Sequence, residues 1–109
     1  MKSEDLFILI EKEILPQCFD IMKTKGQSYS GKEDKLGNFK RLSVLTNSSP
    51  EKVLFIYLMK HIDAISSFIR EEYTDSEAIK GRIMDVINYM FLLSGLLAEE
   101  GKLDVKSNK

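Results

Sequence analysis

The fold is decided by residues 49–101, which run SPEKVLFIYLMKHIDAISSFIREEYTDSEAIKGRIMDVINYMFLLSGLLAEEG. Ser49, Pro50 and Glu51 open this stretch as a typical helix start, with an N-cap, a proline at the first helical position and an acid in the first turn. Apolar residues then recur at intervals of three and four. This spacing predicts a long helix over residues 50–72.

A second long helix follows, over residues 75–100. Thr74 and Glu77 have the spacing of a capping box, and Gly101 is a typical stop. The predicted inward side carries Ile79, Ile83, Val86, Ile87, Met90, Leu93 and Leu97, but apolar residues also lie outside it, namely Met84, Phe91, Leu92 and Leu96. One neighbouring helix cannot cover so many sides, so we expect a second copy of the chain to cover part of this helix.

The residues before this stretch predict shorter helices and one loop. Ser3 fits the N-cap of a first helix, which Pro16 should kink or divide because proline lacks a backbone N–H. From Gly26 to Gly37, three glycines and many polar residues predict a loop that binds something or moves. Asn38 then fits the N-cap of a short helix.

Size and composition limit the fold class and the function. A chain of 109 residues has the size of one domain, and its formal net charge of −1 disfavours binding to duplex nucleic acid. Cys18 is the single cysteine, which excludes an intrachain disulfide. The longest apolar stretch, residues 83–98, is shorter than the ~20 residues of a membrane span, and we do not expect the first residues to act as a secretion signal.

These observations predict an all-α bundle of four or five helices with two long antiparallel helices. We expect a single domain over residues 1–101, followed by a polar C-terminal tail over 102–109. The chain should be cytoplasmic and should form a homodimer or a higher homo-oligomer, with no membrane partner.

A charged pattern occurs on both long helices, as Lys60-x-x-Asp63 and Arg82-x-x-Asp85. Three-residue spacing puts each pair on one face of its helix, so two facing helices would bring two cations and two carboxylates around one cleft. The alternative is a set of ordinary surface salt bridges, each worth ~0.3 kcal/mol.

Four short motifs give the chain a resemblance to a known family. They are Lys25-Gly26-Gln27-Ser28-Tyr29, Asn38-Phe39, Lys60-His61 and Arg82-Ile83-Met84-Asp85-Val86-Ile87-Asn88-Tyr89. Across residues 20–100 they resemble the phage-borne nucleotide-modification-associated domains, which are similar to the all-α nucleoside triphosphate pyrophosphohydrolases of the MazG and dimeric dUTPase type. Those enzymes hold magnesium with Glu-x-x-Glu on one helix and Glu-x-x-Asp on the next. The resemblance implies that Lys60 and Arg82 replace two of these acids.

Such a replacement weakens two-metal hydrolysis but suits direct contact with phosphate. The first hypothesis is therefore a phage-type protein of the host cytoplasm that binds a nucleotide or nucleotide signal, without catalysis or a cofactor. Its expected ligand-binding residues are Lys25, Tyr29, Asn38, Lys60, Asp63, Arg82, Asp85, Asn88 and Tyr89. The alternatives are a magnesium-dependent pyrophosphohydrolase with Asp63 and Asp85 as metal ligands, and a structural protein-interaction module.

Three residues of the long helices, His61, Asn88 and Tyr89, each have two competing interpretations. His61 has no second histidine or cysteine at ligand spacing and falls on the apolar stripe of its helix, which favours a hydrogen-bonded core histidine over a general base. Asn88 and Tyr89 lie one turn beyond Asp85 among apolar neighbours. They either contact a base or ribose, or bond between subunits.

Overall fold

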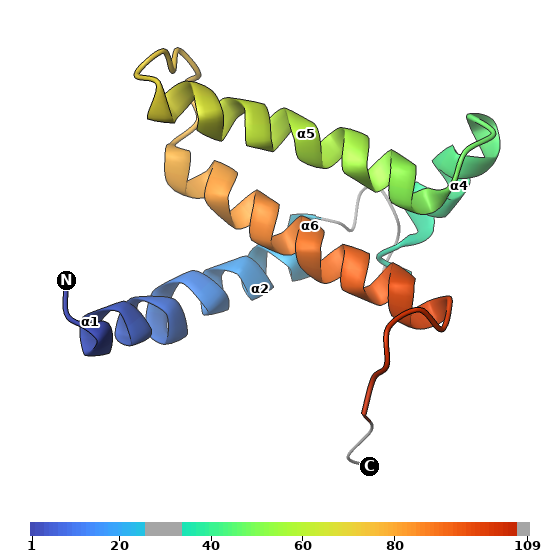
Figure 1. Cartoon of the computed structure of the whole chain (residues 1–109), viewed down its shortest axis with the longest axis horizontal. Coiled ribbons are helices and arrows are strands. Elements are labelled where there is room, and N and C mark those ends of the chain that lie inside the picture. Colours follow the sequence, from blue (N-terminus) through green and yellow to red (C-terminus); the bar gives the residue numbers. More distant parts are fainter. Residues whose placement is uncertain (26–33, 107–109) are drawn as a thin grey trace.

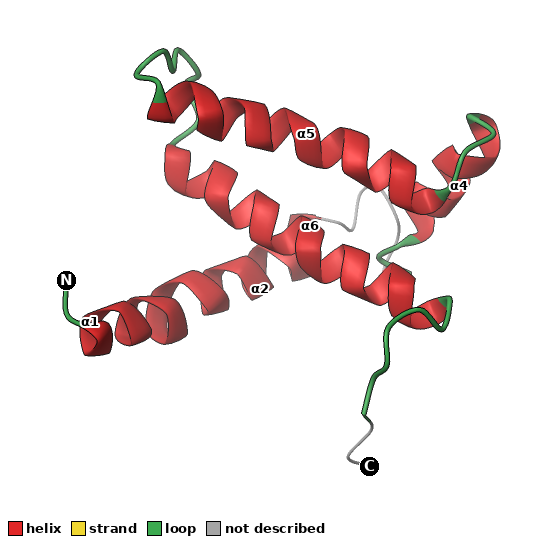
Figure 2. Cartoon of the chain, viewed as in Figure 1, coloured by secondary structure: helices red, strands yellow, loops and turns green. Residues whose placement is uncertain are grey.

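The computed structural model of this chain describes residues 1–25 and 34–106. All regular structure in these two ranges is helical, as the sequence predicts (Figure 2). The helices are α1 (Ser3–Ile8), the π-helical segment η1 (Leu9–Ile14), α2 (Leu15–Lys25), α4 (Gly37–Leu45), α5 (Pro50–Ile69) and α6 (Ile79–Glu99).

The two long helices, α5 and α6, lie side by side and form the body of the fold (Figure 1). Helix α2 packs against α6, and α4 packs against α5. Residues 3–25 together make one helical arm, whose first half extends away from the other helices (Figure 1). The site described below lies where α2 and α4 meet the two long helices.

The hydrophobic core is small and lies between α4, α5 and α6. Leu54 on α5 and Leu96 on α6 are each only 1% exposed, and Phe39 on α4 packs with them. Cys18 of α2 is also fully buried, against α6. The largest fully buried side chains are therefore two leucines and a cysteine, which is little apolar volume for a chain of this length.

The helical arm continues through Pro16 instead of ending there. The backbone N–H of Leu15 donates to the carbonyl of Ile10, five residues back, so the turn before the proline is wider than an α-helical turn. A wide turn accommodates a residue that cannot donate and that crowds the carbonyl before it. The predicted effect of Pro16 thus takes the form of a change of helix type.

The start of α5 is as predicted, whereas the start of α6 is not. The Ser49 hydroxyl accepts the Lys52 N–H at 3.2 Å, with Pro50 as the first helical residue. Helix α6 begins at Ile79, and the predicted capping box of Thr74 and Glu77 is wrong. Glu77 instead donates its backbone N–H to Asp75 at 3.1 Å, and its carboxylate turns toward Arg82.

Two further predicted N-caps are also wrong. Helix α1 begins at Ser3 itself, with Lys2 in the cap position. Helix α4 begins at Gly37, and the turn before it is fixed by Asp34, whose side chain accepts the backbone N–H of Leu36 at 2.9 Å. Asn38 lies inside the first turn of α4 and accepts a hydrogen bond from Arg41.

The inward face of α6 differs most from the prediction. Ile83 and Met90, predicted to face the core, are about two-fifths exposed, whereas Met84 and Leu96, predicted to face another copy, are buried within the chain. The reason is that α2 covers the side of α6 that carries Met84, and polar residues occupy the side that faces α5. Of the residues expected to face a second copy, Met84 and Leu96 are therefore not available to it, whereas Phe91 is 44% exposed.

Candidate functional site

A cavity of about 420 Å³ lies between α2, α4, α5 and α6. This volume is within the ~300–1,000 Å³ range of small-molecule pockets. The described residues that line it are Ile21, Met22, Lys35, Asn38, Phe39, Tyr57, Lys60, His61, Glu77, Arg82, Asp85, Asn88, Tyr89 and Leu92. The wall therefore combines aromatic, cationic and carboxylate side chains from four parts of the chain.

Most of the site residues predicted from sequence meet at this cavity. Those that line it are Asn38, Lys60, Arg82, Asp85, Asn88 and Tyr89. Asp63 does not line it and is exposed, because it follows His61 by two positions and side chains two apart on a helix do not share a face. Lys25 is the last residue of α2, and Tyr29 lies outside the described residues. The predicted pairing of Asp63 with Asp85 around one cleft is therefore wrong.

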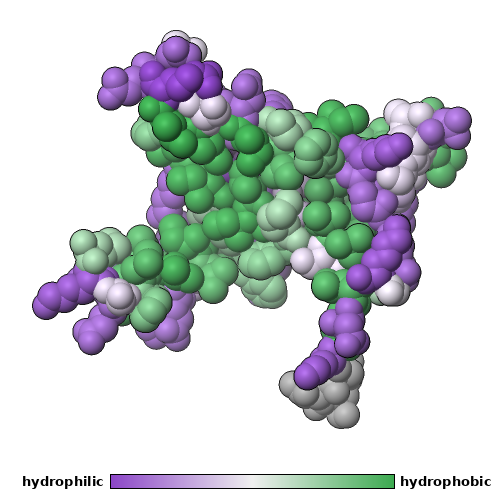
Figure 3. All heavy atoms as spheres, viewed as in Figure 1, coloured by the Kyte–Doolittle hydropathy of each residue, from purple (hydrophilic) through white to green (hydrophobic). Residues whose placement is uncertain are grey.

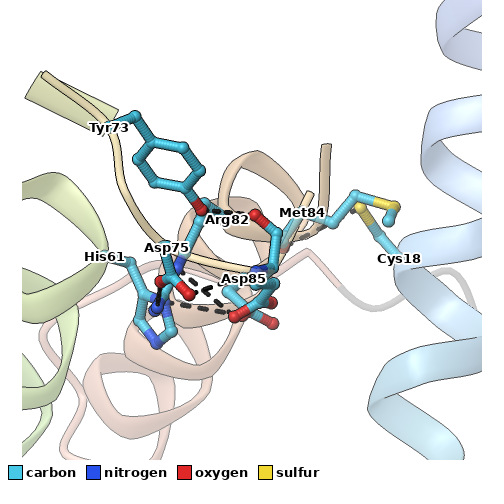
Figure 4. Close-up of polar contacts among 8 residues, drawn as sticks. Cys18, His61, Tyr73, Asp75, Arg82, Met84 and Asp85 are labelled. Atoms are coloured by element: carbon cyan, nitrogen blue, oxygen red, sulfur yellow. Dashed lines mark hydrogen bonds and ion pairs between the residues drawn. The ribbon is translucent and has the colours of Figure 1, made fainter. Parts of the chain in front are cut away.

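Arg82 lies at the centre of a buried polar cluster and is 8% exposed (Figure 4). Its guanidinium donates to the carboxylate of Asp75, lies 3.3 Å from Oε2 of Glu77 through Nε, and reaches Nδ1 of His61 at 3.0 Å through Nη1. The hydrogen bond with Asp75 raises the pKa of Arg82 above its ordinary value and lowers the pKa of Asp75. A phosphate would have to displace two carboxylates to reach this guanidinium.

The loop between α5 and α6 is held in the shape that this cluster needs. The Tyr73 hydroxyl donates to the carbonyl of Glu77, and the Tyr73 ring packs edge-on against Phe68 with ring centres 5.6 Å apart. These contacts position Asp75 and Glu77 over Arg82. Glu77, which the sequence suggested for a helix cap, thus helps Asp75 to hold an arginine.

His61 is the hydrogen-bonded histidine that the sequence favoured, although it also lines the cavity. An arginine can only donate, so a hydrogen bond from Arg82 requires the neutral tautomer of His61 in which Nδ1 accepts and Nε2 carries the ring proton. The Asp85 carboxylate lies 3.5 Å from the same Nδ1, and both side chains are close to 90% buried. Because its acceptor nitrogen is occupied, His61 is poorly placed to act as a general base.

Asn88 lines the cavity and carries a buried hydrogen-bond acceptor. Its side-chain amide donates from Nδ2 to the carbonyl of Cys18 at 3.0 Å, and since a carbonyl can only accept, this bond fixes which end of the amide is which. Oδ1 of Asn88 is buried and accepts no hydrogen bond from the part of the chain that the structure describes. A buried carbonyl oxygen without a donor costs ~1–3 kcal/mol, so this atom is suited to a donor from a ligand.

The contact between α2 and α6 is completed by Cys18. Its thiol lies 4.0 Å from the carbonyl of Met84, next to the bond that its own carbonyl accepts from Asn88. Burial raises the pKa of the Cys18 thiol, and the negative charge of Asp85 raises it further. The thiol therefore stays protonated at neutral pH and acts as a packing group.

Aromatic rings form another part of the wall. Phe39 on α4 packs against Tyr57 on α5 and Tyr89 on α6, each with ring centres 6.3 Å apart and planes inclined by more than 60°. Tyr89 also lies 5.3 Å from His61. Edge-to-face packing fixes these rings against one another, and it gives the cavity apolar surfaces on which a flat ring can stack.

Two lysines supply positive charge that the cluster around Arg82 does not use. Lys35 donates to the backbone carbonyl of Lys23 at 3.2 Å, and Lys60 projects from α5 as an exposed side chain. Neither lysine forms an ion pair with any carboxylate in residues 1–25 or 34–106. Neither would therefore have to break an ion pair with a carboxylate of these residues in order to contact an anion.

Some cavity residues were not among those predicted. Tyr57 carries a usable signal, because it lies three and four positions before Lys60 and His61 and so shares their face of α5. Glu77 gave none, since its spacing from Thr74 is equally that of a helix start. In comparisons with known proteins, no family model, curated protein or solved structure matches this chain.

Proposed function

We propose that this protein binds a nucleotide or a similar phosphate-bearing small molecule in the cavity, without chemical turnover. The observation that carries the proposal is Asn88, which lines a cavity with aromatic rings and lysines and whose Oδ1 is buried without a donor from the described residues. Every nucleobase has a flat face and at least one N–H or amino donor. A base with its donor on Asn88 would satisfy this oxygen.

The base would lie against the rings of Phe39, Tyr57 and Tyr89. These rings belong to three different helices, so the pocket exists only once α4, α5 and α6 have packed together. Stacking of a base on an aromatic ring is worth ~1–3 kcal/mol and does not depend strongly on the base. The rings supply binding energy, and Asn88 supplies preference for a hydrogen-bond donor.

The phosphates would contact Lys35 and Lys60. This modifies the sequence hypothesis, in which Arg82 contacts phosphate, because Asp75 and Glu77 already hold the guanidinium. Arg82 instead holds His61 and the loop between α5 and α6 in position. We take α5 and α6 to run antiparallel along the cavity. A lysine ammonium is a mobile point charge and suits a phosphate of variable length.

Binding without hydrolysis is favoured by the arrangement of the carboxylates. Glu77 is turned toward Arg82 and Asp85 toward His61, while Asp63 lies outside the cavity. A magnesium ion on a triphosphate would need at least one or two carboxylate ligands that are free to bind it. The resemblance to phage-borne nucleotide-modification-associated domains, and action in the host cytoplasm, belong to the same proposal.

A ligand screen by thermal shift would test the proposal. Nucleosides, nucleoside mono- and triphosphates and cyclic dinucleotides are added to the protein with magnesium and, separately, with a chelator. We expect a phosphorylated ligand to raise the melting temperature in both conditions, because binding to the folded state shifts unfolding by mass action. Product analysis by chromatography runs in parallel, and magnesium-dependent product formation would replace this proposal with hydrolysis.

The phosphate contact is tested with two variants of the same helix. Lys60→Ala should weaken the phosphorylated ligand about tenfold or more, since it removes a charged donor, and should leave the parent nucleoside nearly unaffected. Lys52→Ala is the matched control, because Lys52 is an exposed lysine of α5 that does not line the cavity. The proposal fails if no compound of the screen binds at millimolar concentration, or if the two variants behave alike.

A further inference from the structure

Helix α5 carries an exposed apolar stripe that no other helix of the described residues covers. It follows positions 55, 59, 62, 66 and 69, with steps of four, three, four and three residues, and Ser66 is its only polar member. Phe55 and Ile69 are 58% and 75% exposed, and Met59 and Ile62 about 40%. Alternating steps of three and four residues are the repeat of a helix that packs along its length against another helix.

Helix α6 carries a stripe with the same spacing, at positions 83, 87, 90, 94 and 97. Ser94 is its only polar member, and Ile83 and Met90 are about two-fifths exposed. On each helix the stripe lies one position beyond the row that faces the other helix, for example Ile62 after His61 and Ile83 after Arg82. If α5 and α6 run antiparallel, this shift by one residue turns the stripe of each helix to the same side of the two-helix layer.

A single face of the molecule therefore displays both stripes. Figure 3 shows a broad apolar area that runs over α5 and α6 and continues onto the helical arm. None of the residues at the stripe positions lines the cavity, so the two surfaces are separate. We name this surface the α5–α6 face and define it by the five stripe positions of each helix.

The total exposed surface is larger than a separate chain of this mass should have. It amounts to 8130 Å² for 12.5 kDa, whereas a compact monomer would expose about 6,200 Å². The excess of about 1,900 Å² is more than the ~800 Å² that each partner buries in a standard protein interface. The radius of gyration is 15.7 Å, compared with about 13 Å for a compact domain of this length, so the chain is also more extended than a compact monomer.

We infer that the α5–α6 face packs against the same face of a second copy of this chain, so that four long helices form one interface. Two-fold pairing suits a face whose two stripes have equal length and equal spacing, because each stripe then finds a partner with a matching repeat. The exposed apolar side chains of the arm lie at the edge of this face and would extend the contact.

A lipid surface is the other occupant that an apolar face can have, and α6 is long and apolar enough to cross a membrane by length and composition alone. Two observations favour the second copy. Arg82, Asp85 and Asn88 of α6 are buried against α2 and α5, where they bond to other parts of the chain. The formal net charge is −1, so no excess of cations attracts the chain to an anionic bilayer.

Sedimentation velocity of the full chain tests the inference. At micromolar concentration the wild type should have at least twice the 12.5 kDa mass of one chain. Ile62→Glu and Met90→Glu each place a charge in a stripe and should reduce the mass to that of one chain, with helicity by circular dichroism unchanged. Val44→Glu is the control, because Val44 is an apolar residue of α4 that is 80% exposed and lies outside the face, and it should keep the wild-type mass.

A second measurement covers the case in which a charged variant does not fold. The melting temperature of the wild type should rise with protein concentration, since association stabilises the folded state by mass action. A wild type that sediments as one chain overturns the inference. A folded Ile62→Glu variant that keeps the wild-type mass also overturns it. The same holds if the wild type is a single chain that floats with phosphatidylcholine vesicles and if Ile62→Glu abolishes this flotation.

Discussion

The exchange of Asn88 for leucine separates the stability of the free protein from its ability to bind. Asn88 and leucine have nearly the same shape, so the side chain keeps its place between α2 and α6. What changes is the polarity of the group, which loses both its bond to the carbonyl of Cys18 and its buried acceptor Oδ1.

The expected magnitude follows from these two changes. Loss of the hydrogen bond to Cys18 costs about 1 kcal/mol of unfolding free energy, a typical net value for a neutral pair. Removal of a buried acceptor that has no donor raises the free energy of unfolding by ~1–3 kcal/mol. The free energy of unfolding of Asn88→Leu should therefore be unchanged or about 1–2 kcal/mol higher than that of the wild type. Affinity for the ligand should fall by about tenfold or more, since the donor of the base would meet a methyl group.

Urea titration followed by circular dichroism measures the first quantity, at one fixed protein concentration because association would otherwise contribute. Ligand titration measures the second. Asn88→Ala serves as a comparison, because it loses the same polar groups but leaves a void and should be less stable than the wild type. If Asn88→Leu is destabilised by more than about 2 kcal/mol without ligand, Oδ1 is already satisfied in the free protein and the argument from Asn88 is wrong.

Two further predictions concern the cluster around Arg82. Arg82→Ala should lower the free energy of unfolding by about 1–3 kcal/mol, because the bonds of a buried arginine to Asp75 and His61 are lost. The control is Arg70→Ala, which removes an exposed ion pair with Glu72 and should change the free energy of unfolding by only about a few tenths of a kcal/mol in the same urea titration. Acid should weaken the cluster, since the bond from Arg82 holds the pKa of Asp75 below its unfolded value. The folded state then binds fewer protons, so this stabilisation is complete above about pH 4 and is lost as the pH falls further. Thermal melts over that range should show the loss in the wild type, and Asp75→Asn should reduce the dependence on pH.

Most of the helices could be predicted from sequence, because they follow from local patterns. The apolar spacing of residues 50–72 and the start at Ser49 and Pro50 gave α5 nearly correctly. Helix ends depend on what a polar side chain finds after folding, and here the prediction was less accurate. Glu77 could cap a helix or bond an arginine, and only the packed structure brings Arg82 within its reach.

The candidate site could be predicted in part, through charges and polar groups at unusual places on the long helices. The pattern around Lys60 and Arg82 pointed to two helices that do frame a cavity, and Asn88 was singled out as a polar residue among apolar neighbours. The roles within the cavity were not accessible, because the partners of Arg82 come from the loop before α6. Asp63 was assigned by its position in a motif, although the direction of its side chain on the helix places it outside.

The polar inward row of α6 connects the small core to the exposed α5–α6 face. Arg82, Asp85 and Asn88 occupy positions that a helix of this length would ordinarily fill with apolar side chains, so the interior of one chain buries few large residues. A domain of this size has a narrow margin of stability, and the loss of apolar burial on one side has to be offset elsewhere. The residues at the stripe positions of α5 and α6 do not line the cavity, so a second copy that covers the stripes would not have to occupy the site. The proposed binding site inside the bundle and the inferred association surface outside it would thus both follow from the polar residues on the inward row of α6.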